Sequence, residues 1–263
     1  MSALVAKAWR DHRQTLIGFG IGLVLVELLY IAFYPSIRTS AADLQAYMDK
    51  LPPAFRELFG DNFASPEGYL RGQLFGELGP ILFLVVAIGA GARTIAGEEE
   101  ARTLDLLLVT PVRRSQLLMS KAIALTGLIF TLGALTFATV LVLGPPFGLH
   151  APVVHVASAS LTLTLLSVSF AAVALAVGAS TGHRGTAIAV TSALAVGMYV
   201  LNALGIAVDA MEPLRPLSLF RWYTSPPLVA GGIEPRNVVV FLAVTALAYA
   251  AAHIRFERRD LAA

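Results

Sequence analysis

The residues whose types and spacing could do chemistry lie between 97 and 121, where the sequence reads GEEEARTLDLLLVTPVRRSQLLMSK. Three consecutive acids, Glu98, Glu99 and Glu100, could suggest a metal site or a catalytic carboxylate. Neighbouring residues of a helix point about 100° apart, however, so the three carboxylates do not share one face. The pattern therefore indicates no metal site, and it favours the first turn of a helix, where acids lie beside unpaired N–H groups.

The same segment has the pattern of a short helix, a turn and a second helix start. Leu104, Leu107 and Leu108 follow the i, i+3, i+4 spacing of an apolar helical face. Thr110 and Pro111 then provide an N-cap and a first position for the next helix, which leads into an apolar run. An ordinary elbow at a membrane surface and a docking element for a partner protein both fit this pattern.

The amino-acid composition indicates whether water or lipid surrounds most of the chain. Of 263 residues, 57% are hydrophobic and 14% are charged, whereas a soluble domain usually has about 25% charged residues. Lipid is therefore the expected solvent for most of the chain. The absence of cysteine excludes disulfides and thiolate metal sites. The net charge of +2 is too small to argue for a nucleic-acid partner.

Six apolar runs have about the length that a helix needs to cross a bilayer. They span about 15–34, 78–96, 122–143, 156–180, 186–208 and 237–253. The first run is too long for a signal peptide and ends in bulky residues, so we expect it to be retained. The sequence therefore predicts an all-α integral membrane protein with a single transmembrane domain over 1–263.

The distribution of arginine and lysine predicts the orientation. With both termini inside, the outer loops would hold seven of the 19 basic residues, namely Arg38, Lys50, Arg56, Arg71, Arg215, Arg221 and Arg236. The larger share then lies inside, together with the 97–121 segment. We therefore expect a multi-pass protein of the cytoplasmic membrane with both termini in the cytoplasm.

Three segments outside the runs also have recognisable patterns. Residues 2–14 read as an amphipathic helix on the inner leaflet with Trp9 at the interface, although a disordered basic tail is the alternative. The first outer loop, about 35–77, should hold two short interfacial helices, one near Leu44–Leu51 and one beginning at Ser65-Pro66. The aromatic segment around Phe220, Trp222 and Tyr223 fits either a headgroup-level belt or a re-entrant hairpin. 

The 97–121 segment resembles the region after the second span in type-2 ABC exporter permeases. The matching residues are Gly97-Glu98-Glu99-Glu100, Thr103-Leu104-Asp105-Leu106-Leu107, Thr110-Pro111-Val112-Arg113-Arg114, Leu117-Leu118 and Lys121. The six runs, the amphipathic start, the large first outer loop and the aromatic segment before the sixth run extend this similarity over nearly the whole chain.

The resemblance implies a homodimer of permease subunits and two separate ATPase subunits that dock from the cytoplasm and hold ATP and Mg²⁺. It assigns the coupling role to Gly97, Glu98, Glu99, Glu100, Thr103, Leu104, Leu107, Leu108, Thr110, Pro111 and Arg113. It also implies that the second and fifth spans line the dimer interface and the substrate path, and that Leu217–Gly232 folds back as a gate.

The chain itself is not expected to be an enzyme or to bind a cofactor. A P-loop requires GxxxxGK[ST], and no glycine in this sequence is followed by lysine. The ATPase is therefore expected on another chain. Gly18, Gly20 and Gly22 lie inside an apolar run, where close helix packing explains them better than nucleotide binding.

Glu27 and Asn202 are the two polar candidates for a functional role inside the predicted spans. Glu27 is costly at membrane depth, so it should face protein or water, either on a substrate path or in a structural bond to another span. Replacing it with glutamine should alter transport or assembly. Asn202 in the fifth run is a second candidate for the path, or for an interhelical hydrogen bond.

Two other function classes compete with the permease. A secondary transporter would need intramembrane ligands in matching repeats, and Glu27 and Asn202 have no matching partners. An intramembrane serine protease would need a serine beside a histidine at membrane depth, whereas Ser180 and His183 fall in a predicted cytoplasmic loop. The substrate does not follow from the sequence, although the apolar path favours a hydrophobic or amphipathic cargo.

Overall fold

The computed structural model describes residues 2–40, 65–101, 114–229 and 232–258, and these residues form helices and short connections without strands. Six helical segments are long and apolar enough to cross a membrane. They are His12–Thr39, Pro66–Glu100, Arg114–Leu143, Val153–Thr181, Arg184–Ala207 and Pro235–Arg258. The prediction of an all-α protein with six spans is confirmed, and each helix begins before the apolar run that predicted it.

The first span belongs to α1 (Ser2–Thr39), which also includes the expected N-terminal amphipathic segment. That segment is continuous with the span and is not a separate helix. The indole of Trp9 packs on Gly127 of α8 (Arg114–Leu143), where an added Cβ would lie 2.9 Å from the ring. The start of α1 is therefore held against another span by a contact that depends on a glycine.

The second span is part of a long helix with two π-helical stretches. It consists of α4 (Pro66–Tyr69), η1 (Leu70–Leu78), α5 (Gly79–Ala92), η2 (Arg93–Gly97) and α6 (Glu98–Glu100). Its start is the predicted one, because the Ser65 hydroxyl accepts a hydrogen bond from the Gly68 N–H at 3.0 Å and Pro66 occupies the first turn. The prediction of a separate short interfacial helix beginning at Ser65-Pro66 is wrong, because this helix continues into the second span. The helix expected near Leu44–Leu51 lies outside the described residues.

The helix α9 (Val153–Thr181) lies at the centre of the bundle and contacts α5, α8, α10 (Arg184–Ala207) and α12 (Pro235–Arg258). Of its most apolar stretch, 72% is buried within the protein, against 17% for α12. A Cβ added at Gly91 of α5 would collide with the Ala171 carbonyl oxygen of α9. Small residues thus allow the close helix approach that packing in lipid requires.

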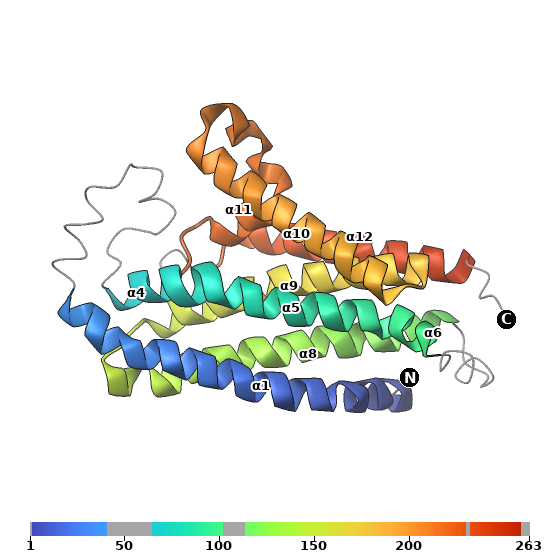
Figure 1. Ribbon diagram of the computed structural model, residues 1–263, viewed down its shortest axis with the longest axis horizontal. Coiled ribbons are helices and arrows are strands. Elements are labelled where there is room, and N and C mark those ends of the chain that lie inside the picture. The colour runs from blue at the N-terminus through green and yellow to red at the C-terminus, as the bar shows by residue number, and fades with distance from the viewer. Residues whose placement is uncertain (1, 41–64, 102–113, 230–231, 259–263) are drawn as a thin grey trace.

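The helices run side by side, with α1 packed on α8 at one edge of the bundle and α10 diverging at the other (Figure 1). The start of α1, the short helix α6 and the end of α12 share one end, which we call the proximal end. At the opposite, distal end, η4 (Asp209–Leu217) and α11 (Leu219–Thr224) connect α10 to α12. Because the number of spans is even, the start of α1 and the end of α12 lie at the same end of the bundle.

Candidate functional site

The three acids of the opening motif lie at the proximal end, in the last turn of the helix that contains the second span. The expectation that they begin a new helix is wrong for Glu98–Glu100, because the helix passes through η2 without a break. Carboxylates at a helix C-terminus are disfavoured by the negative end of the helix dipole. These acids therefore depend on positive groups from other helices.

Glu98 obtains such a group from the third span. Its Oε1 forms an ion pair with the Lys121 Nζ of α8, and the two side chains are 24% and 8% exposed. A charge-assisted hydrogen bond in such a partly dry setting is stronger than one in water. The pair ties the end of the second span to the third, a contact that the sequence did not predict.

Glu100 obtains its partner from the fifth span. Its Oε1 accepts a hydrogen bond from the backbone N–H of Arg184 at 2.8 Å. Arg184 is the first residue of α10, and the N–H groups of a first turn have no partner within their own helix. The carboxylate thus caps α10 at the positive end of its dipole. Together the two acids fasten α6 to α8 and α10.

The other predicted coupling residues divide into two groups. Gly97 lies at the end of η2, where the aliphatic part of the Arg93 side chain crosses it so closely that an added Cβ would lie 2.8 Å from Arg93 Cγ. Glu99 lies between the two fastening acids on α6. Thr103, Leu104, Leu107, Leu108, Thr110, Pro111 and Arg113 lie outside the described residues.

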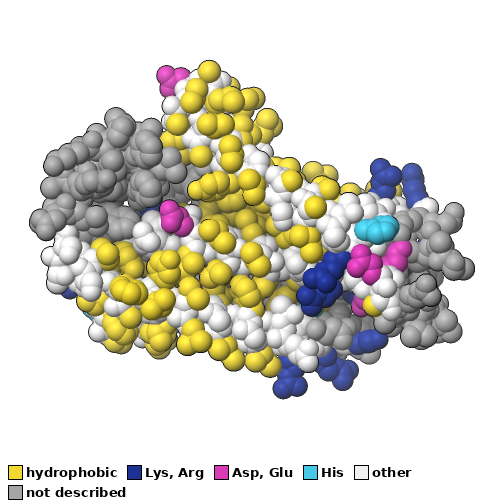
Figure 2. All heavy atoms as spheres, viewed as in Figure 1, with side chains coloured by type: hydrophobic (Ala, Val, Ile, Leu, Met, Phe, Trp, Pro, Cys, Tyr) yellow, Lys and Arg dark blue, Asp and Glu magenta, His cyan; other side chains and the backbone are white. Residues whose placement is uncertain are grey.

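An apolar groove of about 610 Å³ runs between α5 and α10. Ile81, Leu84 and Val85 form its wall on α5, while Val196 and Tyr199 form the wall on α10. Phe220 of α11 also lines it. Figure 2 shows hydrophobic side chains across the middle of one face of the molecule, with charged side chains gathered at the proximal end. The second and fifth spans therefore share a hollow whose surface suits an apolar molecule or another helix.

The segment between α10 and α12 folds back onto the bundle. The Tyr223 hydroxyl donates to the carbonyl oxygen of Phe75 in η1, and burial raises the pKa of this hydroxyl well above its usual range. Because it stays protonated, Tyr223 remains a neutral donor. The Asn237 amide of α12 donates to the carbonyl oxygens of Trp222 and Ser225. These bonds attach the C-terminal end of α11 to the spans.

Aromatic contacts complete this attachment. The ring of Phe220 lies 6.1 Å from that of Phe170 in α9 and 5.4 Å from that of Tyr199 in α10, measured between centroids. Phe220 and Tyr223 are buried within the protein, so the expectation of a headgroup-level belt is wrong for these two. Trp222 is partly exposed and stacks under the Arg236 guanidinium at 4.8 Å.

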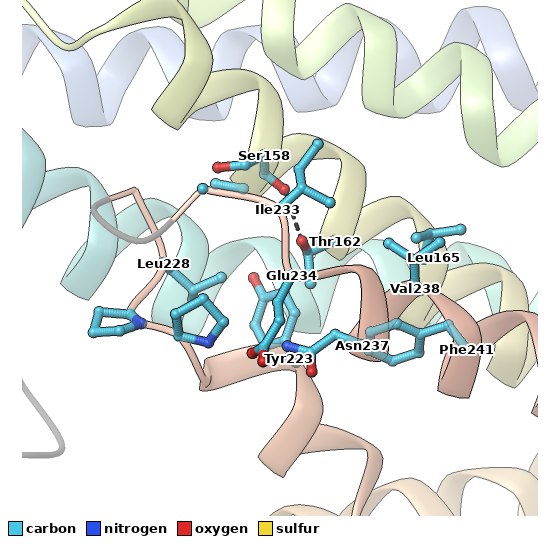
Figure 3. A pocket seen from close by; sticks show the side chains of 14 residues that line it. Ser158, Thr162, Leu165, Tyr223, Leu228, Ile233, Glu234, Asn237, Val238 and Phe241 are labelled. Carbon is cyan, nitrogen blue, oxygen red and sulfur yellow. Dashed lines mark hydrogen bonds between the residues drawn. The ribbon is translucent and has the colours of Figure 1, made fainter.

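A small cavity separates this segment from α9. Figure 3 shows Tyr223 and Asn237 at one edge of it and Ser158 and Thr162 of α9 at the other. Its volume is about 10 Å³, room for no more than one water molecule. The contact is thus closely packed and does not form a ligand site.

The two polar candidates within the spans lie away from the groove. Glu27 is buried between α1 and α8, where its Oε1 accepts a hydrogen bond from the Thr136 hydroxyl at 2.7 Å. Its Oε2 has no hydrogen-bond partner among the described residues. Asn202 is buried on α10, and its Oδ1 likewise has no such partner in this part of the chain. Neither side chain lines the groove.

The serine and histidine that a protease would require do not meet. The Ser180 hydroxyl donates to the Ala176 carbonyl oxygen at 2.7 Å. The Nδ1 of His183 lies 2.8 Å from the Thr181 carbonyl oxygen. Both side chains bond to backbone near the proximal end, so they form no nucleophile–base pair.

The comparison with protein families gives one match over almost the whole chain. A family model described as "ABC-2 family transporter protein" matches residues 2–261. No curated protein matches the sequence significantly. The matched range includes all six spans, the proximal attachments of α6 and the folded-back segment.

Proposed function

The chain belongs to the ABC-2 transporter family, and from this premise we propose that it is the permease subunit of an ATP-driven exporter. Family membership makes it a membrane permease component that associates with an ABC ATPase. We add that a single permease domain over 1–263 pairs with a second copy, and that two ATPase subunits, which hold ATP and Mg²⁺, dock on the segment 97–113. Both termini and this segment then lie in the cytoplasm, where positive charges accumulate.

The attachment of α6 to two other spans is the observation that carries the proposed coupling. A force on the segment after Gly97 acts first on α6. From there the Glu98–Lys121 ion pair transmits it to α8, and the Glu100 bond to the Arg184 N–H transmits it to α10. Movement of one short segment would thus displace the second, third and fifth spans together.

The groove between α5 and α10 supports the proposed substrate path. It combines a volume of about 610 Å³ with a wall of apolar side chains. Several apolar side chains that face outward from these two helices are strongly exposed, including Val85 at 64% and Val196 at 62%. A second copy that faces this groove would cover these side chains and enclose a path between the two chains.

The docking proposal is tested by co-purification with the ATPase. The chain is co-expressed with an ABC ATPase encoded beside it, and the double variant Leu104→Asp, Leu107→Asp is compared with Leu214→Asp. Leu214 is an exposed leucine of η4 at the distal end, so its variant should retain the ATPase. The double variant should lose it, because two carboxylates would enter an apolar contact. Equal retention in both variants would overturn the proposed docking segment.

The pairing of two copies is tested by cross-linking. The chain has no cysteine, so a single introduced thiol has no background. Val196→Cys on α10 and Leu247→Cys on α12 are both strongly exposed positions within spans. A short bifunctional maleimide should join two chains through position 196 and not through position 247. The reverse pattern would place the partner on α12 and refute the proposed interface.

A further inference from the structure

A second cavity of about 500 Å³ adjoins the groove at the proximal end, and we call it the basic cavity. Its polar wall includes three basic residues, Arg93, Lys121 and Arg184, and one acid, Glu98, while Val85 and Gly89 of α5 belong to its apolar wall. Figure 2 shows this transition from hydrophobic to charged side chains along one face of the molecule. The walls come from different turns of the same long helix and from α1, α8 and α10.

The charges on the polar wall do not cancel. Lys121 is paired with Glu98. Arg93 forms no ion pair within the described residues, and its side chain leaves η2 over Gly97, where any larger residue would push it aside. Arg184 has a buried Nε without a hydrogen-bond partner in the described part of the chain. Two guanidinium groups therefore face a common hollow with capacity to bind an anion.

The basic cavity is continuous with the apolar groove. Val85 and Gly89 line both hollows, so the two meet along one face of α5. Val85 precedes Arg93 by eight residues, or about 12 Å along a helix. An occupant that reaches both parts would carry a charged head and an apolar chain of at least that length.

We propose that the basic cavity binds an anionic phospholipid of the adjoining leaflet, with its phosphate at Arg93 and Arg184 and an acyl chain along Val85 and Gly89 into the groove. Basic pockets between membrane helices bind such headgroups because the phosphate oxygens accept several charge-assisted hydrogen bonds. This site goes beyond the proposed function, since it requires neither an ATPase nor a second copy.

The headgroup part is tested by native mass spectrometry of the full chain in a zwitterionic detergent. Phosphatidylglycerol and phosphatidylcholine with the same acyl chains are titrated, and the apparent Kd of the first bound lipid is compared. We expect phosphatidylglycerol to bind about tenfold more tightly, and the double variant Arg93→Gln, Arg184→Gln to remove this preference. Equal affinity for the two lipids in the unmodified chain would overturn the proposal.

A matched control separates the cavity from general surface charge. Arg255 and Arg258 are exposed at the end of α12, near the same end of the bundle, and do not line the cavity. The variant Arg255→Gln, Arg258→Gln should keep the preference for phosphatidylglycerol. The same loss in both double variants would refute the cavity as the binding site. Retention of the preference in Arg93→Lys, Arg184→Lys would support a role for charge at these positions.

The acyl-chain part is tested at Gly89, where the two hollows meet. An added Cβ at Gly89 finds no atom within 4 Å, and Gly89 lines both hollows, so Gly89→Phe is chosen to place a ring where they meet. It should weaken long-chain phosphatidylglycerol binding several-fold, while a dihexanoyl lipid is unaffected. Gly22→Phe on α1, which also has open space around its Cβ, should change neither. Equal competition by inorganic phosphate and long-chain lipid would overturn the acyl contact.

Discussion

Two short helical segments, α6 at the proximal end of the second span and α11 between α10 and α12 at the distal end, are attached to the bundle by different chemistry. Ionised carboxylates attach α6, one to the Lys121 ammonium and one to a helix N-terminus. Neutral donors, backbone carbonyl oxygens and aromatic rings attach α11. The side chains of α6 remain partly or fully exposed, whereas Tyr223 and Phe220 of α11 are buried.

The difference follows from the cost of removing charge from water. An ion pair at a partly hydrated end avoids most of the desolvation penalty and still gains from mutual attraction. A segment packed deep against other helices gains more from neutral hydrogen bonds that satisfy backbone carbonyls. The comparison teaches that the proposed coupling end is held by bonds between charged groups. The distal segment is held mainly by neutral hydrogen bonds and ring contacts, with the Arg236 guanidinium over Trp222 as a charged contact at its edge.

Replacement of Lys121 should produce the largest effect. Lys121→Met keeps the apolar stem and removes the ammonium, so the partly buried Glu98 carboxylate loses its ion pair with Lys121. We expect a loss of about 2 kcal/mol in stability, since the pair is only partly buried and a fully buried one would cost more. Thermal unfolding of the protein in detergent measures this loss.

The double variant Lys121→Met, Glu98→Gln is the control for that prediction. It removes both charges, so most of the lost stability should return. If the double variant is as unstable as the single one, lost packing around the lysine stem explains the effect. In that case the attachment of α6 would not depend on charge, and the contrast with the neutral attachment of α11 would not hold.

Replacement of Asn237 should produce the next largest effect. Asn237→Leu is similar in size but leaves the carbonyl oxygens of Trp222 and Ser225 without this donor. We expect a loss of about 1–2 kcal/mol. The loss should be equal at low and high salt, because no ionised group takes part. A marked salt dependence measured by thermal unfolding would contradict the neutral character of the distal attachment.

Tyr223→Phe should have a smaller effect because it removes a single hydroxyl and preserves the ring. Loss of its bond to the Phe75 carbonyl should cost about 1 kcal/mol, in the range measured for single hydrogen bonds between membrane helices. Tyr199→Phe is the matched control, since that side chain is 47% exposed and makes its ring contact with Phe220 without its hydroxyl. Equal destabilisation by both changes would show that the hydroxyl bond contributes nothing.

Glu27 combines features of both attachments, because it is an acid that is buried between α1 and α8 and bonded to a neutral hydroxyl. Glu27→Gln retains an oxygen that can accept from Thr136, so we expect a change of at most about 0.5 kcal/mol. The effect on export should then be equally small, in contrast to the change expected from the sequence. Loss of export with unchanged unfolding and unchanged dimer yield would instead assign Glu27 to the transport cycle.

Structural features that are set by adjacent residues were predicted correctly from the sequence. The helix start at Ser65-Pro66 was identified because an N-cap and its proline are adjacent. The helix position of Glu98–Glu100 was predicted incorrectly, because whether a helix breaks or continues at Gly97 depends on groups that stabilise its end. Those groups, Lys121 and the Arg184 N–H, are far away in the sequence and adjacent only in the fold.

The burial of Phe220 and Tyr223 has the same explanation. An aromatic residue between two apolar runs is compatible with the membrane interface and with the protein interior, since its ring is apolar and its edge can be polar. Only the presence of Phe170 and of the Phe75 carbonyl oxygen decides between them. The sequence contains these residues but does not indicate that they meet.

The amino-acid sequence by itself determined the solvent, the six spans and the family pattern, because hydrophobicity and helix length act within continuous stretches of chain. The tertiary structure decided which helix each polar group serves, where the groove opens and which arginines share a cavity. These depend on the packing of α5, α8 and α10 around α9, and contacts between distant residues are fixed only when close packing selects one arrangement.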